Sequence, residues 1–391
     1  MAIDSTALRL QFPGAQSDWA RFDGPAGTQM HGYAIDAMQG WAASGDNANC
    51  GGAFAASGAT DELLASTREV GARFFGAPTP SVWFGPNMTT MTFAFTRAVA
   101  RDWQPGDRIV GTRLDHDANV STWHAAATDR GAELVLADFD RDTGRLDPES
   151  IGSLLDERTR WVAVTGASNL LGTIPDVAAI AKLAHDAGAR VFVDAVHLAP
   201  HVRLDIGALG CDAIVTSAYK WYGPHAAMMW VEPALAERVE SYKVRPASNR
   251  GVARFESGTA NFEALAGVRA AAHFMLERGA DVAAHERSCF ARLLDGLASI
   301  PRVAVVGPKG LDGRTPTVAF VVDGCHPADV ARDLAHDRIA VWSGDSYATE
   351  VAAHLGIGDT GGVVRAGVVA YVDDDDVDRL VASLERICQS V

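Results

Sequence analysis

Short apolar runs alternate with amphipathic segments between about residues 80 and 235. Seven of these runs have the length and composition of strands: Ser81–Phe84, Arg108–Leu114, Glu133–Ala137, Trp161–Thr165, Arg190–Val193, Ala213–Thr216 and Met228–Val231. Helices are expected in most of the gaps, for instance over Thr89–Arg101, Val177–Ala187 and Leu235–Ser241. Near-continuous apolar strands joined by helices are typical of an α/β protein with a mostly parallel sheet covered on both faces.

The pattern changes after residue 260. The elements expected there are helices over Phe262–Arg278, Asp281–Ser299, Pro327–His336 and Asp373–Cys388, and strands at Val303–Val306, Thr317–Val322, Ile339–Trp342 and Val363–Tyr371. In the last helix the apolar residues recur at helical spacing and form one buried face. The acidic run at 373–376 opens that helix, where it complements the helix dipole better than it suggests a metal site.

This change predicts three parts of the chain. Residues 1–30 form a segment that packs back on the body, residues 31–260 form a large domain, and residues 261–391 form a smaller α+β domain. A chain of 391 residues is long enough for more than one domain.

The composition of the chain argues against some kinds of binding partner and indicates which cellular compartment to expect. A net charge of −15 leaves no basic stripe for nucleic acid or an anionic membrane. The amino terminus does not read as a signal peptide, and no run approaches the length of a membrane span. The five cysteines are scattered and lack a CxxC pair, so a reducing cytoplasm is expected rather than a disulfide framework or a zinc site.

Lys220 is the first candidate for chemistry. Only four of the 34 basic residues are lysines, and this one lies in "SAYKWYGPH", directly after an apolar strand. Its aromatic neighbours predict partial burial, which lowers an ammonium pKa and yields an amine nucleophile. Arginine cannot form a Schiff base, which is a reason for a lysine here. A surface cation is the alternative interpretation.

Asp194 ends another apolar strand, in "VFVDAVH", and so lies at the carboxyl edge of the predicted sheet. A carboxylate there can hold a pyridinium nitrogen protonated, so that the ring draws electrons from an attached carbanion. His197, three residues on, could donate a hydrogen bond to a ring oxygen. A capping aspartate and a packed histidine are the structural alternatives.

Two further motifs follow strands. In "FGPNMTTMTFAF" a strand meets a Gly-Pro-Asn turn, and the two threonines Thr89 and Thr90 then open an apolar helix whose free N–H groups and hydroxyls suit a phosphate. A simple capped helix is the alternative. In "LDHDANVSTW", His116 could stack on a flat heteroaromatic ring or move a proton. Together, the phosphate site, the ring cover, the pyridinium partner and the amine predict pyridoxal phosphate (PLP) as cofactor.

The sequence also resembles the class V aminotransferase superfamily of fold-type I PLP enzymes, and more narrowly its cysteine desulfurase-like branch. The resemblance runs from "RFDGPAGTQ" to "VVRAGVVAYVDDDDVDRL". Its most specific motifs are "LDHDAN", "ASNLLGTIPDV", "VDAVHLAPH", "SAYKWYGPH" and "RFESGTANFEALAG".

The resemblance implies roles at the cofactor. Lys220 forms the covalent link and serves as catalytic base, Asp194 binds the pyridine nitrogen, and His116 stacks on the ring and has a catalytic role. The other cofactor contacts that it implies are His197, Asn169, Met88, Thr89, Ser217 and Tyr219.

It also implies substrate and subunit contacts. Arg365 holds the substrate α-carboxylate, with Asn169 nearby. Thr259 reaches the phosphate of a neighbouring subunit, which implies a homodimer with its active sites at the interface.

One position departs from the desulfurases. Their nucleophilic cysteine, which accepts sulfur as a persulfide, corresponds to Tyr347 in "VWSGDSYATE", and none of the five cysteines lies on this stretch. Tyr347 becomes a candidate substrate contact instead.

These features favour a C–S β-elimination lyase that acts on an amino acid without a persulfide cysteine. An aminotransferase and an epimerase or racemase share the first step, abstraction of the α-proton, and remain alternatives. A non-catalytic PLP-binding protein is a lesser alternative, because the set Lys220, Asp194, His116 and Arg365 is complete.

Overall fold

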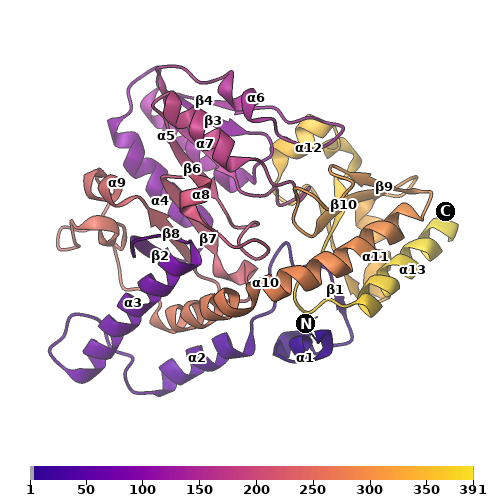
Figure 1. The fold of residues 1–391 in the computed structure, drawn as a ribbon, viewed down its shortest axis with the longest axis horizontal. Coiled ribbons are helices and arrows are strands. Elements are labelled where there is room, and N and C mark those ends of the chain that lie inside the picture. The colour runs from indigo at the N-terminus through magenta and orange to yellow at the C-terminus, as the bar shows by residue number, and fades with distance from the viewer. Residues whose placement is uncertain (1–3, 391) are drawn as a thin grey trace.

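The computed structural model describes residues 4–390, and its centre is a seven-stranded sheet in the order β2-β8-β7-β6-β5-β3-β4 (Figure 1). The strands are β2 (Val82–Gly85), β3 (Arg108–Thr112), β4 (Glu133–Ala137), β5 (Thr159–Thr165), β6 (Arg190–Asp194), β7 (Ala213–Ser217) and β8 (Ala227–Val231). β8 runs in the direction opposite to the other six strands of this sheet. The predicted α/β class with a mostly parallel sheet is confirmed.

Both faces of this sheet are buried, which explains why its strands are apolar throughout. Along β6, Val191 and Val193 join the core on one side, while Phe192 packs on the other side against Phe95 and Trp123, with ring centroids 5.5 and 5.3 Å away. The helices of the first side include α3 (Ala55–Phe74), α7 (Val177–Asp186) and α8 (Ile206–Leu209), and those of the second are α4 (Met88–Val99), α5 (Ser121–Arg130) and α9 (Pro233–Arg238).

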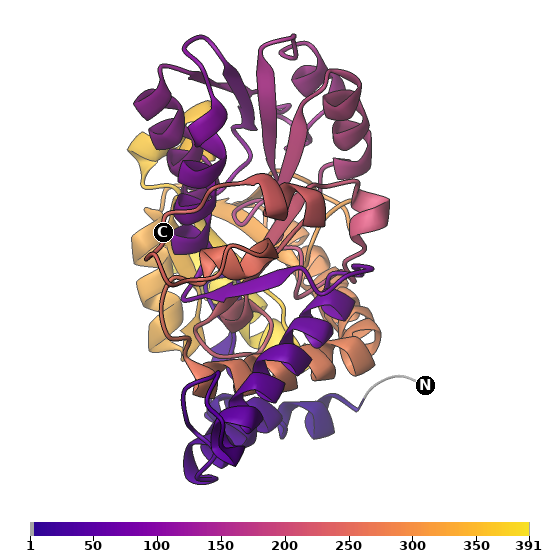
Figure 2. The ribbon, with the colours of Figure 1, turned by 90° about the vertical axis from the view of Figure 1, so that its left-hand side faces the viewer.

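Helix α10 (Phe262–Ala298) is continuous, so the prediction of two helices separated near residue 280 is wrong. Gly279 lowers helix propensity by about 1 kcal/mol, but nothing there blocks the helix. Buried residues lie on both sides of Gly279, namely Met275, Val282 and Glu286, and their packing stabilises the helix as one continuous element. Figures 1 and 2 show α10 running past α2 (Gly32–Ala43) and α3, and at its far end it packs against α13 (Asp374–Ser390).

A second, antiparallel sheet follows α10 in the order β12-β13-β10-β9. It consists of β9 (Val303–Val306), β10 (Thr317–Val322), β12 (Trp342–Gly344) and β13 (Val363–Gly367), and α11 (Pro327–His336) and α13 pack beside it. The core around α10 continues into this sheet. The domain boundaries predicted at residues 30 and 260 stay a prediction.

One predicted strand is divided and another is shorter. The stretch Ile339–Trp342 splits at Val341, because β11 (Ile339–Ala340) pairs in parallel with β1 (Ala20–Arg21), whereas β12 pairs with β13. β13 ends at Gly367 rather than Tyr371, and one more bond, from Val368 N–H to the carbonyl of Pro316, follows it in the same register. The acidic run does open the last helix, with the Asp373 carboxylate accepting from Asp376 N–H at 3.0 Å.

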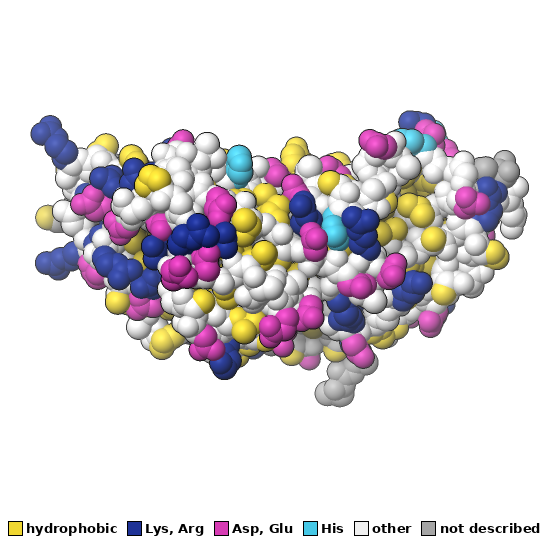
Figure 3. Space-filling model, turned by 90° about the horizontal axis from the view of Figure 1, so that it is seen from above, with side chains coloured by type: hydrophobic (Ala, Val, Ile, Leu, Met, Phe, Trp, Pro, Cys, Tyr) yellow, Lys and Arg dark blue, Asp and Glu magenta, His cyan; other side chains and the backbone are white. Residues whose placement is uncertain are grey.

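The surface carries mixed charge. On the face shown in Figure 3, acidic and basic side chains are interspersed without a continuous basic band. Within residues 4–390, none of the helices combines the length and apolar content needed to cross a bilayer.

Candidate active site

A cavity of about 470 Å³ lies at the carboxyl ends of the central strands. It is lined by Met88, Thr89, His116, Ala118, Thr165, Ala167, Asn169, Asp194, Val196, His197, Ser217, Tyr219 and Lys220. Nine of these are predicted site residues that are far apart in the sequence. The parallel strands bring them together because their carboxyl ends share one edge of the sheet.

Lys220 ends the short 3₁₀ turn Ala218–Lys220 that follows β7, and its ammonium donates to the carbonyl oxygen of Pro25. The nitrogen lies 5.4 Å from the centre of the Tyr219 ring. Burial, and after it Arg365, lowers the pKa of Lys220 to about 7, against the opposing effect of Asp194. A substantial fraction of the amine is therefore uncharged and nucleophilic near neutral pH.

Asp194 ends β6, the strand next to β7, and is 4% exposed. Its Oδ1 accepts from Val196 N–H at 2.9 Å. Burial raises the pKa of this carboxyl to about 6, while Val196 N–H and Lys220 oppose the rise. The carboxylate would gain from a cationic partner in the cavity, because such a partner favours its charged form.

Sequence reasoning missed Asp115, a second buried acid beside Asp194. Its carboxylate accepts from the Thr112 hydroxyl and from Asn119 Nδ2, the latter at 2.7 Å. Burial raises its pKa to about 8, and the charge of Asp194 adds to the rise. The signal was present, since Asp115 directly precedes His116 in the quoted motif "LDHDAN".

The two predicted histidines are uncharged at neutral pH. His116 Nδ1 accepts from Ala118 N–H at 3.0 Å, so its proton lies on Nε2. Burial, and then Lys220, lowers the His116 pKa to about 4. His197 is 3.0 Å from the Thr317 hydroxyl through Nε2, and burial holds its pKa well below 6.5.

The amino end of α4 borders one side of the cavity. Met88 N–H donates to the Ser217 hydroxyl at 3.0 Å, and Thr89 follows on the first turn. Asn87 caps the helix by accepting from Thr90 N–H at 2.8 Å. Backbone N–H groups and hydroxyls at a helix start are suited to a phosphate. Tyr219 borders this end and stacks on His225, with ring centroids 5.0 Å apart.

Arg365, on β13, is 4% exposed and donates through Nη1 to the carbonyl oxygen of Asn169 at 2.9 Å. Its Nε and Asn169 Oδ1 are buried polar atoms without a hydrogen-bond partner among the described residues. Burial lowers the pKa of Arg365 to about 10, so the guanidinium stays charged at neutral pH. An unpaired donor and an unpaired acceptor, on two residues joined by a hydrogen bond, suit a ligand that has both a carboxylate and an N–H group.

Three predicted site residues, Arg365, Tyr347 and Thr259, are not among the residues that line the cavity. Tyr347 is 72% exposed and stacks on His116, with ring centroids 5.7 Å apart and an interplanar angle of 26°. Its carbonyl accepts from Asp117 N–H at 2.7 Å, and the carbonyl of Ser346 accepts from Asn169 Nδ2 at 2.8 Å. Thr259 lies on an exposed stretch before α10.

The amino-terminal segment also borders the site, a role that the sequence reasoning did not assign to it. Thr28 N–H donates to the carbonyl of Tyr219 at 2.8 Å, next to the contact between Lys220 and Pro25. The Gly-Pro turn in "RFDGPAGTQ" was the available signal.

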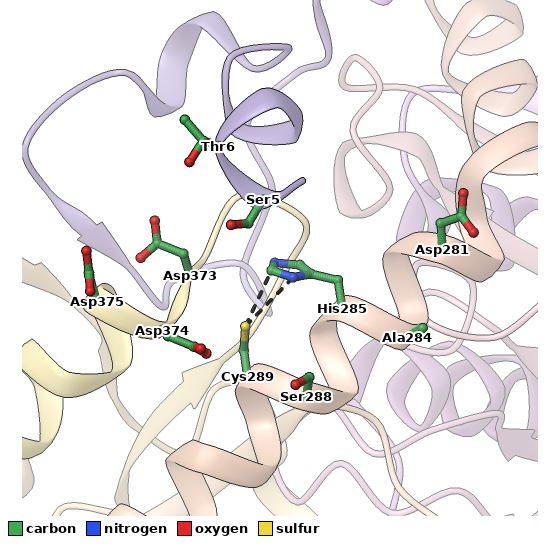
Figure 4. A pocket seen from close by; sticks show the side chains of 10 residues that line it. All are labelled: Ser5, Thr6, Asp281, Ala284, His285, Ser288, Cys289, Asp373, Asp374 and Asp375. Carbon is green, nitrogen blue, oxygen red and sulfur yellow. Dashed lines mark hydrogen bonds between the residues drawn. The ribbon is translucent and has the colours of Figure 1, made fainter. Parts of the chain in front are cut away.

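A larger cavity of about 1030 Å³ lies elsewhere, where the amino-terminal helix meets α10 and the start of α13 (Figure 4). In it, Cys289 Sγ is 3.9 Å from both ring nitrogens of His285. Burial, and then Asp374, raises the Cys289 pKa to about 12, so this thiol stays protonated and is a poor nucleophile. The described residues that line this cavity include no lysine, so the cavity does not match the predicted chemistry.

Comparison with known proteins agrees with the geometry. The family model of class V aminotransferases matches residues 21–380. A cysteine desulfurase of Dickeya dadantii is 33% identical over 73% of this chain and 71% of its own length. The apo structure of a cysteine desulfurase from Thermococcus onnurineus has a TM-score of 0.92 at 25% identity and covers 100% of this chain and 99% of that one.

A third match is to C-DES, in a mutant with glycine covalently linked to its PLP cofactor. It has a TM-score of 0.83 at 20% identity over 96% of this chain and 98% of that one. The chain therefore belongs to the class V aminotransferase family, a family of PLP-dependent enzymes, and it is cysteine desulfurase-like.

Proposed function

We propose that this enzyme binds PLP through Lys220 and catalyses β-elimination at the C–S bond of a cysteine-type amino acid without a persulfide cysteine. The observation that carries the proposal is the pair Lys220 and Asp194, at the ends of adjacent strands and facing one cavity. An amine of lowered pKa opposite a buried carboxylate is the arrangement that an aldehyde cofactor with a basic ring nitrogen requires.

The residues present fit PLP. Lys220 would hold the aldehyde carbon, Asp194 the ring nitrogen, and Ser217 with Thr89 the phosphate, while His116 would cover the ring. Met88, His197, Tyr219 and Asn169 would complete the wall. When bound, PLP supplies an aldehyde that reacts with amines and a ring that withdraws electrons from the substrate α-carbon.

Different residues of the protein would orient the substrate and move its α-proton. Arg365 Nε and Asn169 Oδ1, both unpaired among the described residues, orient the substrate carboxylate and amine. Lys220 accepts the α-proton, because its amine is partly uncharged at neutral pH. His116 Nε2–H is a donor on the cavity wall.

Elimination needs no protein thiol. A cysteine S-conjugate and one water give a thiol, pyruvate and ammonia, so sulfur leaves as the thiol itself. The described residues of the cavity wall include no cysteine. Burial raises the pKa values of Cys211 and Cys289 to about 12, and Cys50 is exposed away from the wall. Tyr347, in place of a sulfur carrier, would cover the site over His116 and border the substrate.

The proposal includes a homodimer. An open cleft of about 1500 Å³ adjoins the phosphate end and shares Thr89 and Tyr219 with the cavity. Thr259 is exposed in its own subunit. In the proposed dimer, the partner's Thr259 covers this cleft and contacts the phosphate.

The test is product analysis of the PLP-loaded enzyme. Incubation with cysteine, cysteine S-conjugates and a panel of amino acids should release thiol or sulfide and pyruvate in equal amounts. K220A should lose the visible absorbance of bound PLP and all activity, while the surface variant K182A should keep both. Pyridoxamine phosphate accumulating without pyruvate would favour an aminotransferase, and α-deuterium exchange with loss of chirality an epimerase or racemase. Cofactor binding without any turnover would indicate a non-catalytic protein.

A further inference from the structure

The backbone at Tyr222, two residues after Lys220, is unusual. Its φ is +70°, a left-handed conformation that bulky side chains rarely adopt and glycine adopts readily. The side chain is nevertheless fully buried, with its ring 5.1 Å from that of Phe12. A bulky residue persists in such a conformation only where its surroundings fix it, and such positions cluster at functional sites.

The Tyr222 hydroxyl is fixed by two partners from distant parts of the chain. It donates to Glu286 Oε1 on α10 at 2.9 Å and accepts from Ala370 N–H at 3.1 Å. Burial, and then Glu286, raises the pKa of Tyr222 well above its ordinary value, so the hydroxyl remains a donor. Ala370 lies three residues beyond the end of β13, so this bond connects the turn after Lys220 to the segment that follows the strand of Arg365.

Glu286 has a second partner. Its Oε2 is 2.8 Å from His201 Nδ1, and its side chain is fully buried. A buried carboxylate is tolerated where hydrogen bonds satisfy both oxygens, as they do here. Carboxylate, phenol and imidazole therefore form one connected network behind the Lys220 turn.

The Tyr222 backbone is held on the opposite side. Its N–H donates to the Thr28 hydroxyl at 2.9 Å, and its carbonyl accepts from His31 N–H at 2.9 Å. Both partners belong to the amino-terminal segment whose Pro25 carbonyl accepts from Lys220. The turn that carries Lys220 is thus fixed from its backbone and its side chain at once.

We infer that Tyr222, hydrogen-bonded to Glu286 and through it to His201, fixes the turn that carries Lys220 so that the amine points into the cavity. Tyr222 acts through Lys220 and does not line the cavity itself. This inference rests on the proposed function only in taking Lys220 as the amine that binds PLP.

The experiment measures how fast PLP attaches covalently to Lys220. Apoprotein is mixed with PLP, the adduct is trapped at intervals with borohydride, and the labelled peptide is quantified by mass spectrometry. Every variant is assayed well below its own melting temperature and over a range of pH, so that loss of folded protein does not mimic loss of rate.

The variants separate positioning from stability. Y222F keeps the ring and removes the hydroxyl, and E286A removes the carboxylate. Both should slow attachment by about 10–100-fold, as expected when a reacting group is misplaced by about 1 Å. E286Q keeps an oxygen for Tyr222 and offers an N–H to His201, so it should recover most of the rate lost in E286A. T67V removes another fully buried hydroxyl, which bonds to the Leu63 carbonyl in α3, and serves as the matched control at wild-type rate.

The outcomes are distinct. Attachment at wild-type rate in folded Y222F and E286A, or slowing in T67V equal to that in Y222F, would overturn the inference. If Y222F does not fold, T28V, which removes the acceptor of Tyr222 N–H in the amino-terminal segment, replaces it with the same expectation. Failure of wild-type protein to attach PLP would instead contradict the proposed function.

Discussion

Replacing Lys220 with methionine should stabilise the PLP-free protein, most strongly below pH 7. Burial, and after it Arg365, lowers the Lys220 pKa from 10.5 to about 7. Below pH 7 the amine is charged in both the folded and the unfolded state, so the folded protein bears the full cost of a buried cation. Between pH 7 and 10.5 only the unfolded state keeps the proton, so this cost falls as the pH rises and disappears above 10.5.

The structure gives the size of the effect. A pKa lowered from 10.5 to about 7 corresponds to about 4–5 kcal/mol of folding free energy. Two effects reduce the expected gain to about 2–3 kcal/mol. Water reaches the amine through the cavity, and K220M leaves the Pro25 carbonyl without its hydrogen-bond donor. For a chain of this length that is a rise in Tm of about 3 °C at pH 6.

Thermal unfolding of the apoproteins from pH 6 to 10.5 measures this gain. The control is K182M, since the Lys182 side chain is 75% exposed in its pair with Asp186 and its removal should give no comparable change with pH. The reasoning is refuted if K220M is no more stable than wild type at pH 6, or if its advantage does not shrink as the pH rises. A confirmed gain would mean that the protein holds a reactive amine at a cost in stability.

Three further predictions address the remaining site groups. R365K should raise KM for the amino acid by about 10–100-fold, with a smaller change in kcat. The reason is that a lysine cannot both keep the contact with Asn169 and supply a second donor in place of Nε. Steady-state kinetics measures both constants, and a change in kcat alone would contradict the prediction. D194N should keep PLP bound but slow α-deuterium exchange by about 100-fold or more, measured by NMR, since asparagine cannot hold a charged ring nitrogen. Iodoacetamide should modify the exposed Cys50, as mass spectrometry would show, with thiol release unchanged; loss of activity on alkylation would point to a sulfur-carrying cysteine.

Some local features were misjudged because the pattern of apolar residues reports burial, not pairing. Gly279 looked like a helix end, yet the buried stripe on both sides of it continues α10. Val341 looked like the interior of a strand, yet the residues before and after it pair with different sheets. In both places a tertiary contact overrode a local preference.

The sequence by itself determined the layered α/β fold and which side chains follow the carboxyl ends of its central strands. Continuous apolar strands require cover on both faces, and parallel strands must end at one edge, so Lys220, Asp194 and His116 had to meet there. The proposed role of the amine also rests on its type, because arginine cannot replace lysine in a covalent step.

Only the tertiary structure decided what holds these groups in place. Tyr222 and Glu286 are 64 positions apart, and Arg365 and Asn169 are 196 apart. Such contacts join single polar atoms that are far apart in the sequence, so they leave no periodic pattern in the chain. Burial does leave one, because buried positions recur at every second residue of a strand and every third or fourth residue of a helix. The sequence therefore predicts the reacting groups, and long-range hydrogen bonds between buried atoms set their positions.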